Sequence, residues 1–283
     1  MKAGDYNENV EIATAYLTLA GKGADVVTVT AASDDHVFEV TDNHVNISGF
    51  NVAGATGATG ISNAGIYLKG AGHCNISDNN CSYNDGNGIY LDSSSNNTLL
   101  NNTASNNEGD GIYLDSSSNN TLLNNTASNN EYDGGYYGIE LYDSSDNLIY
   151  NNYFDNTNNA YDNGVNTWNT TKTPGLNIIG GSFIGGNYWS DYKGNDPDGD
   201  GLGNMSYSID GDGNSDYHPL CPPSSVKGDL NGDGTLTPAD AAIALRLAVT
   251  GACDDAADVS GDGTVTSLDA LMILQAAADM VEL

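Results

Sequence analysis

The chain has 283 residues, 38 acidic against 7 basic side chains, and a formal net charge of −31. Because Arg246 is its one arginine, it cannot follow a phosphate backbone, and nucleic acid is excluded as a partner; an anionic membrane surface is disfavoured for the same reason. No run of about 18 apolar residues is present, so we expect no membrane insertion. A hydrophobic content of 39% and strong periodicity favour a folded chain over a disordered one.

The first residues, MKAGDYNENVEI, have no basic segment followed by an apolar stretch, so they do not form a signal peptide. We nevertheless expect an exported, extracellular or cell-surface protein whose leader is missing from this sequence. Sequons for N-glycosylation are dense, although a chain rich in Asn, Ser and Thr also makes them by chance. The candidates are Asn46, Asn75, Asn96, Asn101, Asn119, Asn124, Asn169 and Asn204.

A 23-residue repeat fills the first half of the chain. The segment GIYLDSSSNNTLLNNTASNNEGD from Gly88 recurs almost unchanged from Gly111. The same frame starts at Gly65 and, after a four-residue insertion around 134–137, at Gly138. Apolar residues alternate in short runs within each copy, which predicts very short strands between Asn, Ser and Gly turns.

Short strands at this period predict a parallel β-helix in which each coil stacks on the previous one at about 4.8 Å. The expected fold class is mainly β: a right-handed parallel β-helix of about 23 residues per coil, followed by a small α-helical domain. Identical residues then fall in register. Asn97 with Asn120, and Asn102 with Asn125, should form ladders whose side-chain amides bond from coil to coil.

Four cysteines are present, and none lies in a C-x-x-C pair, so a structural zinc site is not expected. The local disulfide pairing would join Cys74 to Cys81 and Cys221 to Cys253. Cys74 and Cys81 take the places of Asn97 and an alanine in the next coil, so inward packing is the alternative for both.

The repeats resemble the NosD-type carbohydrate-binding and sugar-hydrolysis repeats of surface proteins from methanogenic archaea. The resemblance rests on the motif GIYL…SSNN…NN and covers roughly residues 1–155. The following residues, 156–220, look like the C-terminal cap of such proteins, whose aromatic side chains would close the apolar end of the rod. The resemblance implies a β-helical rod at the cell surface.

Catalysis has to be weighed, because some parallel β-helices are polysaccharide lyases and hydrolases. A lyase needs a basic residue, but Lys69 is the only Lys between positions 23 and 171. An inverting hydrolase needs two carboxyl groups about 6.5–9.5 Å apart. Asp92 and Asp115 share a column that also holds Lys69 and Tyr142, which is typical of a variable surface. We therefore predict that the chain is not an enzyme.

A carbohydrate-binding face is the alternative use of the rod. Tyr67, Tyr90 and Tyr113 alternate with inward residues and are spaced by 23, so they should form an outward aromatic stack. Sugar rings can lie on such a platform. Equally, stacked tyrosines can serve only to hold neighbouring coils together.

Two twelve-residue loops of EF-hand pattern lie 29 residues apart near the C-terminus. Alternating oxygen ligands with a sharp turn at position 6 suit calcium, which takes six to eight oxygen atoms. Each loop leads into residues at helical spacing. The predicted calcium ligands are Asp229, Asn231, Asp233, Thr235 and Asp240 in the first loop, and Asp258, Ser260, Asp262, Thr264 and Asp269 in the second.

Residues 228–283, after a linker at 221–227, resemble a dockerin, because Asp stands at position 12 and one helix follows each loop. The resemblance implies a cohesin-like partner. Dockerins often contact cohesin through a Ser/Thr pair at positions 10 and 11, where this chain has Pro238-Ala239 and Ser267-Leu268. Neighbouring copies of the chain, forming a homopolymer, and its own rod therefore stay open as partners.

A third acidic segment precedes the linker. Alternating Asp and Gly suggest another calcium loop, although position 12 holds Tyr207, and a hydrated acidic loop is the alternative. The candidate ligands are Asp196, Asp198, Asp200, Asp210 and Asp212.

Two functions follow from these features. We favour an extracellular, non-catalytic surface or assembly protein, tethered or polymerised into filaments through a calcium-dependent dockerin. The alternative is a carbohydrate-binding module or polysaccharide-active enzyme that a dockerin carries into a cohesin-based complex, with surface glycans as ligands.

Overall fold

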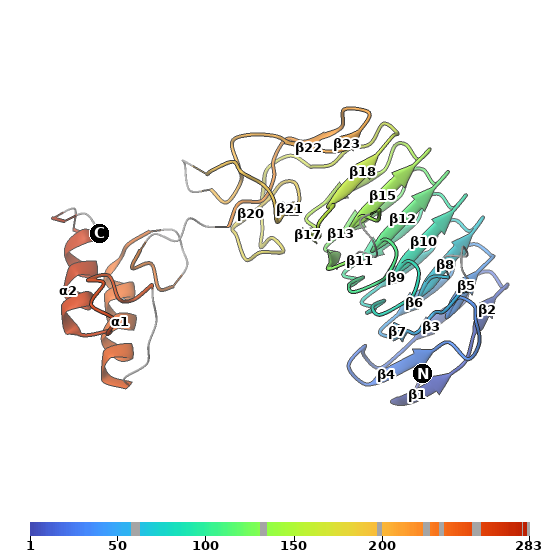
Figure 1. Cartoon of the computed structure of the whole chain (residues 1–283), viewed down its shortest axis with the longest axis horizontal. Coiled ribbons are helices and arrows are strands. Elements are labelled where there is room, and N and C mark those ends of the chain that lie inside the picture. The colour runs from blue at the N-terminus through green and yellow to red at the C-terminus, as the bar shows by residue number, and fades with distance from the viewer. Residues whose placement is uncertain are drawn as a thin grey trace. The chain divides into compact units, whose positions relative to one another are not determined.

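The computed structural model describes residues 1–57, 63–130, 135–196, 200–222, 227–231, 235–250, 256–278 and 280–281. The chain forms two compact units, Met1–Asn195 with Leu202–Leu220, and Asp196–Gly201 with Cys221–Leu283. The first unit is a parallel β-helix, which confirms the fold expected from the repeat (Figure 1). The second unit carries the two helices.

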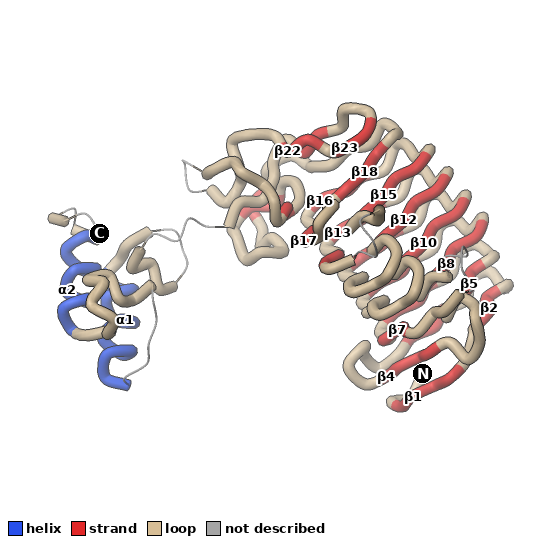
Figure 2. The backbone as a smooth tube through the Cα atoms, in the orientation of Figure 1, coloured by secondary structure: helices blue, strands red, loops and turns tan. Residues whose placement is uncertain are grey.

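The described strands of the rod stack into three faces (Figure 2). The first face, here called the long sheet, has eight strands, and all of its neighbouring strands are parallel. In spatial order they are β2 (Val10–Ile12), β5 (Phe38–Val40), β8 (Ile66–Lys69), β10 (Ile89–Asp92), β12 (Ile112–Asp115), β15 (Ile139–Tyr142), β18 (Ala160–Asp162) and β23 (Asp210–Gly211).

The second face is a six-stranded sheet of β3 (Thr18–Ala20), β6 (Asn46–Ser48), β9 (Asn75–Ser77), β11 (Thr98–Leu100), β13 (Thr121–Leu123) and β16 (Leu148–Tyr150). The third face begins with β1 (Gly4–Asn7), β4 (Val27–Thr30) and β7 (Asn51–Ala53), and it continues through single bridges at Asn80 and Thr103 to β14 (Thr126–Ser128), β17 (Tyr153–Asp155) and β21 (Tyr188–Trp189). Two short antiparallel pairs join β19 (Thr173–Pro174) to β20 (Phe183–Ile184) and β22 (Tyr207–Ser208) to β24 (Ser215–Asp216).

The register follows the repeat. Ile89 pairs with Ile112, 23 residues later, and Ile112 pairs with Ile139, 27 residues later. The four-residue insertion therefore does not disturb the strands. Columns of apolar side chains fill the core, and from β5 to β15 of the long sheet and from β6 to β16 of the six-stranded sheet they are fully buried. Examples are Leu68, Leu91, Leu114 and Leu141 in the long sheet.

The chain turns its corners with residues in the left-handed region, where Asn and Asp are tolerated better than other non-glycine residues. One corner column contains Asn96 and Asn119, and another contains Asn101 and Asn124, all with φ between 56° and 62°. This explains half of the asparagine in each repeat. The other half is buried directly after these corners.

Three ladders of buried asparagines run along the rod, and they confirm the predicted coil-to-coil bonding. The backbone N–H of Asn97 donates to Asn120 Oδ1 (2.8 Å), and Asn102 Nδ2 donates to Asn125 Oδ1 (3.0 Å). The ladders are Asn97, Asn120, Asn147 and Asn166; Asn79, Asn102, Asn125, Asn152 and Asn187; and Asn84, Asn107, Asn130 and Asn156. They satisfy backbone groups that the corners leave without a strand partner.

Each ladder ends on a carboxylate. Asn166 Nδ2 donates to Asp162 (2.8 Å), and Asn187 N–H donates to Asp216 (2.7 Å). The third ladder passes through Asn159, whose Nδ2 donates to Asp191 (2.7 Å). A carboxylate only accepts hydrogen bonds, so it can terminate a chain of donors but cannot continue it. Asp162 and Asp216 also accept the indole N–H groups of Trp168 and Trp189, which fixes the apolar end of the rod.

The predicted disulfide between Cys74 and Cys81 is wrong, because both are free, buried thiols. Cys74 directly precedes β9, at the position that Asn97 takes one coil later, and its backbone N–H donates to Asn97 Oδ1. Cys81 packs in the core at the position of Ala104. Cys221 is also a free thiol, whereas Cys253 lies outside the described residues.

The second unit contains α1 (Pro238–Thr250) and α2 (Ser267–Ala276), which pack on a small core of Ala241, Ala244, Val259, Ala270 and Ile273. Thr266 caps α2, since its hydroxyl accepts the N–H of Leu268 (3.1 Å) while Asp269 accepts the N–H of Thr266 (2.8 Å). No helix among the described residues has the length and apolar character needed to cross a bilayer.

Replacing Asn120 by Ala should lower the free energy of unfolding of the rod by about 2–5 kcal/mol, because the N–H of Asn97 and the carbonyl of Ser94 lose their partner inside the protein. Asn119→Gly is the matched control: this neighbour is exposed with φ +58°, a conformation glycine adopts freely. Denaturant unfolding followed by tryptophan fluorescence reports on the rod, because both tryptophans lie there. Equal effects of the two variants would contradict the ladder's role.

The rod should lose stability as the pH rises from about 4 to about 6. Burial raises the pKa of Asp216 from 3.8 to about 6, so within this window the folded state binds the proton that the unfolded state has lost. The contribution is on the order of 3 kcal/mol, present below the unfolded pKa and lost above the folded one. Asp216→Asn should flatten this part of the pH profile, and Asp212→Asn, at an exposed position, should leave it unchanged. A wild-type rod whose stability rises across this window would contradict the assignment.

Candidate functional site

A file of outward side chains runs along the long sheet, and we call it the tyrosine file. In register it contains Glu39, Tyr67, Tyr90, Tyr113, Glu140, Tyr161 and Asp210. The rings of Tyr67 and Tyr90 are 5.0 Å apart between centroids, and those of Tyr90 and Tyr113 are 4.9 Å apart. The expected vertical stack is therefore confirmed.

The stack leaves few ring faces open. Tyr67 is only 8% exposed, because the His36 ring covers it at 4.1 Å on the side away from Tyr90. Its hydroxyl donates to Asp92 (2.9 Å). Burial raises the pKa of Tyr90 to about 12. This geometry favours cross-strand stacking over a platform for sugar rings, so sugar binding by Tyr67, Tyr90 and Tyr113 stays a prediction.

Two carboxyl groups meet beside Tyr113. Asp110 lies in the corner before β12, is 3% exposed, and accepts the N–H of Tyr137 (2.6 Å). Glu140 is the half-buried residue opposite Tyr113. Burial raises the pKa of Asp110 well above its usual range and also raises that of Glu140. The charge of Glu140 raises the pKa of Asp110 further, and the charge of Asp115 raises that of Glu140.

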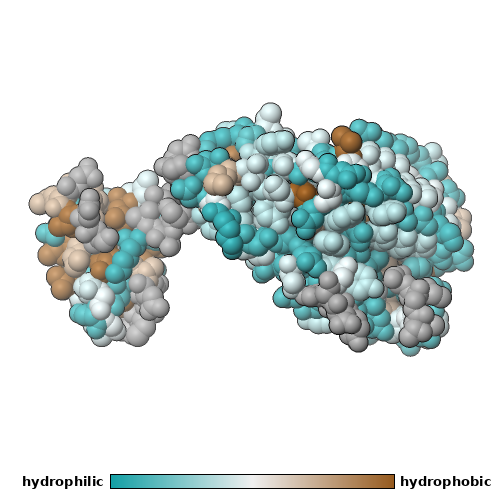
Figure 3. Space-filling view, turned by 45° about the horizontal axis from the view of Figure 1, so that its top comes forward, coloured by the Kyte–Doolittle hydropathy of each residue, from teal (hydrophilic) through white to brown (hydrophobic). Residues whose placement is uncertain are grey.

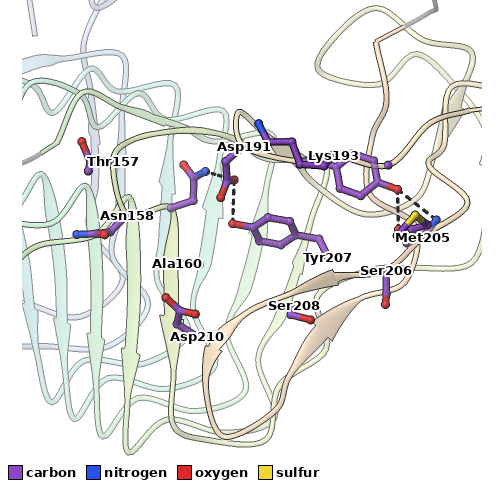
Figure 4. Close-up of a pocket in the computed structure, with 13 residues that line it drawn as sticks. Thr157, Asn158, Ala160, Asp191, Lys193, Met205, Ser206, Tyr207, Ser208 and Asp210 are labelled. Carbon is purple, nitrogen blue, oxygen red and sulfur yellow. Dashed lines mark hydrogen bonds between the residues drawn. The ribbon is translucent and has the colours of Figure 1, made fainter.

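A polar cavity of about 310 Å³ opens at the C-terminal end of the tyrosine file (Figure 4). Asp210, the last member of the file, lines it together with Asp191, Tyr207 and Lys193. The hydroxyl of Tyr207 donates to Asp191 Oδ1 (3.0 Å), the same atom that accepts from Asn159 at the end of a ladder. The carboxyl pair therefore lies within the tyrosine file, and the cavity lies at the end of the file.

Hydrogen bonds from backbone N–H groups to the carboxylates of the second calcium loop hold it in a closed conformation. Asp258 Oδ1 accepts the N–H groups of Gly261 and Asp262, and its Oδ2 accepts that of Gly263 (2.7 Å). Asp269 reaches across the loop to accept from Ser260 (2.9 Å). Desolvation opposes ionisation of Asp269, but these bonds prevail and hold its pKa at about 2. Thr264 donates its hydroxyl to Asp262 (2.7 Å), so every predicted ligand position of this loop is described.

The first loop repeats this arrangement where it is described. Asp240 Oδ1 accepts from the N–H of Asn231 (3.0 Å), and its Oδ2 accepts from Thr237. Asp229 and Thr235 are described, but Asp233 lies outside the described residues. Carboxylates and other hard oxygen donors around each loop suit calcium, and the carboxylate at position 12 closes the loop as in an EF-hand.

The third acidic segment is divided between the two units. Asp196 and Asp200 belong to the unit with the helices, where Asp196 accepts the N–H of Asp200 (3.1 Å). Asp210 and Asp212 belong to the rod, and Asp198 lies outside the described residues. Calcium binding there stays a prediction.

All eight sequon asparagines are at least partly exposed, and their occupancy stays a prediction. Three groups were missed by reasoning from the sequence: the ladder-ending carboxylates, the pair of Asp110 and Glu140, and the Tyr207 cavity. One signal was present for the pair. The backbone N–H of Asp110 donates to Asn87, the equivalent residue one coil earlier, so an acid replaces a buried amide at this position.

Comparison with known families decides the membership of the rod. Residues 6–194, more than half of the chain, match the model of the periplasmic copper-binding protein NosD. The chain belongs to the NosD family. Residues 227–276 match the dockerin type I domain, so this NosD-family rod is followed by a dockerin. No curated protein matches the chain.

Dockerin type I domains bind calcium, which is the cofactor of this module, and dockerin domains bind cohesin domains. They are extracellular or cell-surface modules, and the NosD family is described as periplasmic. The described residues do not fit the copper of the family name, because they contain no group of three or more His, Cys, Asp or Glu arranged to hold a metal.

Three solved structures resemble the rod in fold. Two are GH87 α-1,3-glucanase catalytic domains, one with nigerose (18% identity, TM-score 0.48, 58% of this chain and 32% of that one) and one with tetrasaccharides (20%, 0.41, 58% and 34%). The third is the periplasmic alginate epimerase AlgG (20%, 0.37, 48% and 34%). This chain spans about a third of the length of each.

These structures correct one prediction from the sequence. The expectation that the chain is not an enzyme is wrong as an exclusion, because β-helical domains of this kind include catalytic domains of carbohydrate-active enzymes. The likeness itself reports the fold alone. The case for any activity must come from this chain's own residues.

Removing one calcium loop should lower the calcium stoichiometry of the chain by one. Asp229→Ala and Asp258→Ala each delete the first ligand of a loop, and the double variant should lose two ions. Isothermal titration of the full chain measures this, with Asp85→Ala on the rod as the control. Loss of both ions in one single variant would show that the loops do not bind independently, and no loss in either would contradict the ligand assignment.

Proposed function

We propose that this NosD-family chain is a carbohydrate-active protein. Its rod binds a polysaccharide on the long sheet beside Glu140 and cleaves a glycosidic bond at the carboxyl pair of Asp110 and Glu140, and its dockerin attaches it to a cohesin-bearing partner. The observation that carries the proposal is the carboxyl pair itself, in which the half-buried Glu140 faces outward in the tyrosine file beside the buried Asp110.

Cleavage of a glycosidic bond needs a carboxylic acid that is still protonated near neutral pH, and a second carboxylate to assist attack. The pair supplies the acid, because two neighbouring carboxyls cannot both ionise at low cost. Glu140 is the partly exposed member, so it is the group that can pass its proton to a leaving oxygen. Asp115, in the next column of the adjacent strand, is the candidate for the second carboxylate.

Asp110 is a positioning residue in this proposal. It is buried, its carboxylate accepts the N–H of Tyr137, and its own backbone N–H donates to Asn87. Asp110 therefore cannot reach a substrate itself. Its contribution is to tune the acid, because Asp110 lowers the pKa that burial raises at Glu140. Tyr113 and Tyr161 flank Glu140 in the file and would bound the sugar chain on either side.

The helices of the dockerin support attachment to a partner. Apolar side chains stay exposed on both helices, where Figure 3 shows hydrophobic surface gathered, and a cohesin would cover them. They are Leu245 (48% exposed), Val249 (87%), Leu268 (51%), Leu271 (48%) and Leu274 (44%). Assembly of copies into a homopolymer, occupied sequons and a methanogen-type surface origin stay predictions.

The proposal predicts that Glu140→Gln lowers the rate of polysaccharide cleavage about 100-fold or more, because the amide has no proton to give. Release of reducing ends from a panel of glucans, xylans, mannans and polyuronates measures it in the full chain with calcium. Asp110→Ala should shift the alkaline limb of the pH–rate profile to higher pH, because Asp110 lowers the pKa of Glu140 and the variant removes that effect.

Asp85→Asn, at an exposed position of the same unit, is the control and should keep full activity. Wild-type chain that binds a glycan without cleaving any member of the panel would reduce the proposal to a carbohydrate-binding module. Cleavage that survives Glu140→Gln unchanged would refute the role of the pair.

A further inference from the structure

We propose that the cavity at the C-terminal end of the tyrosine file is a binding subsite for a neutral sugar unit, with Tyr207 as its stacking platform. This inference deepens the proposed function and rests on it. It names the position and the chemical class of the glycan that the rod would hold beside Glu140.

Tyr207 is the end ring of an aromatic pile that rises from the core. The Phe154 and Trp189 rings stack at 4.8 Å, and the Trp189 and Tyr207 rings stack at 4.3 Å with only 9° between their planes. Phe154 and Trp189 are fully buried. Tyr207 lines the cavity, and Trp189 covers its inner face, so the opposite face of the ring is the one available to a ligand.

The tyrosine file differs in this respect. Tyr90 has a ring neighbour on each side, and Tyr67 is covered by His36. A sugar binds an aromatic ring through its face, where the C–H groups of the pyranose meet the π-system. Tyr207 therefore offers what the stack of three tyrosines does not.

The platform is also held rigidly. Its hydroxyl donates to Asp191, Asp191 accepts in turn from Asn159, and Asn159 continues a ladder that begins deep in the rod. Trp189 behind it is fixed by the bond from its indole N–H to Asp216 (3.0 Å). A ring fixed before binding loses little entropy when a ligand arrives.

The rim of the cavity suits a sugar with free hydroxyls. In the view of Figure 4 the Tyr207 ring lies between Asp191 and Asp210, and Ser208 and Lys193 also reach the cavity. Carboxylates accept hydrogen bonds from sugar hydroxyls. Two acids against one base, in a chain of net charge −31, would repel a uronate, so the ligand class is a neutral glycan.

The cavity also lies close to the carboxyl pair along the long sheet. Glu140 pairs with Tyr161, and Tyr161 pairs with Asp210, so the rim lies two strands from the proposed acid, roughly 10 Å. Ala160 lines the cavity and leaves room in it, because it is smaller than the isoleucine at the paired position of the four preceding strands. Those residues are Ile66, Ile89, Ile112 and Ile139.

The test is binding of the full chain to neutral gluco-, xylo- and manno-oligosaccharides and to oligogalacturonate, by isothermal titration with calcium present. Wild type should prefer a neutral oligosaccharide. Tyr207→Leu should weaken that binding roughly tenfold. Ser208→Trp should do the same by filling the cavity from its exposed rim, which avoids disturbing the aromatic pile. Tyr217→Leu, an exposed tyrosine that does not line the cavity, is the control.

Glu140→Gln should keep the binding while it loses turnover, whereas the cavity variants should raise KM. Wild-type binding that survives both Tyr207→Leu and Ser208→Trp would overturn the subsite and leave the proposed function standing. Preference for oligogalacturonate would overturn the ligand class. A wild-type chain that neither binds nor cleaves any glycan would overturn the proposed function and the subsite with it.

Discussion

The rod depends on one constraint: the corners of each coil turn backbone groups toward the core, and buried polar side chains, most of them asparagines, must satisfy them. A β-helix of short strands has few ladder bonds per residue between strands, so its corners decide whether it is stable. Asn120 illustrates the solution, because its amide bonds to both neighbouring coils, to Asn97 and Ser94 in the preceding one and to Asn147 in the following one. Stacking then follows from the repetition of one residue type. The apolar columns fill the space that the ladders enclose.

The candidate sites lie where this pattern changes. Asp110 takes a position that holds an amide one coil earlier, and with Glu140 it forms a carboxyl pair. Asp191 ends a ladder and at the same time orients Tyr207. In both places a group that belongs to the scaffold also bounds an accessible polar surface. The hydrogen bonds of the rod therefore fix the positions of the side chains at both candidate sites, without a separate layer of supporting residues.

The sequence predicted whatever is periodic or local. The 23-residue frame led to the strands, their register and the asparagine ladders, and the twelve-residue spacing led to the calcium loops. It did not predict contacts that join unrelated positions. Tyr207 meets Trp189 and Asp191 only because the chain returns to the end of the rod, and no repeat marks that return. Nor did the sequence predict that Asp216, close in sequence to the acidic segment, is buried and accepts the indole N–H of Trp189.

The ladder-ending carboxylates give the rod a definite length. An asparagine both accepts and donates, so it passes the chain of bonds on to the next coil, whereas an aspartate accepts from both sides and closes it. The change from amide to acid thus ends the hydrogen-bonded stacking of coils. It occurs at Asp162, Asp191 and Asp216. A longer rod would need these three acids moved outward together, and a designer who duplicates the repeat must insert the new coils before them.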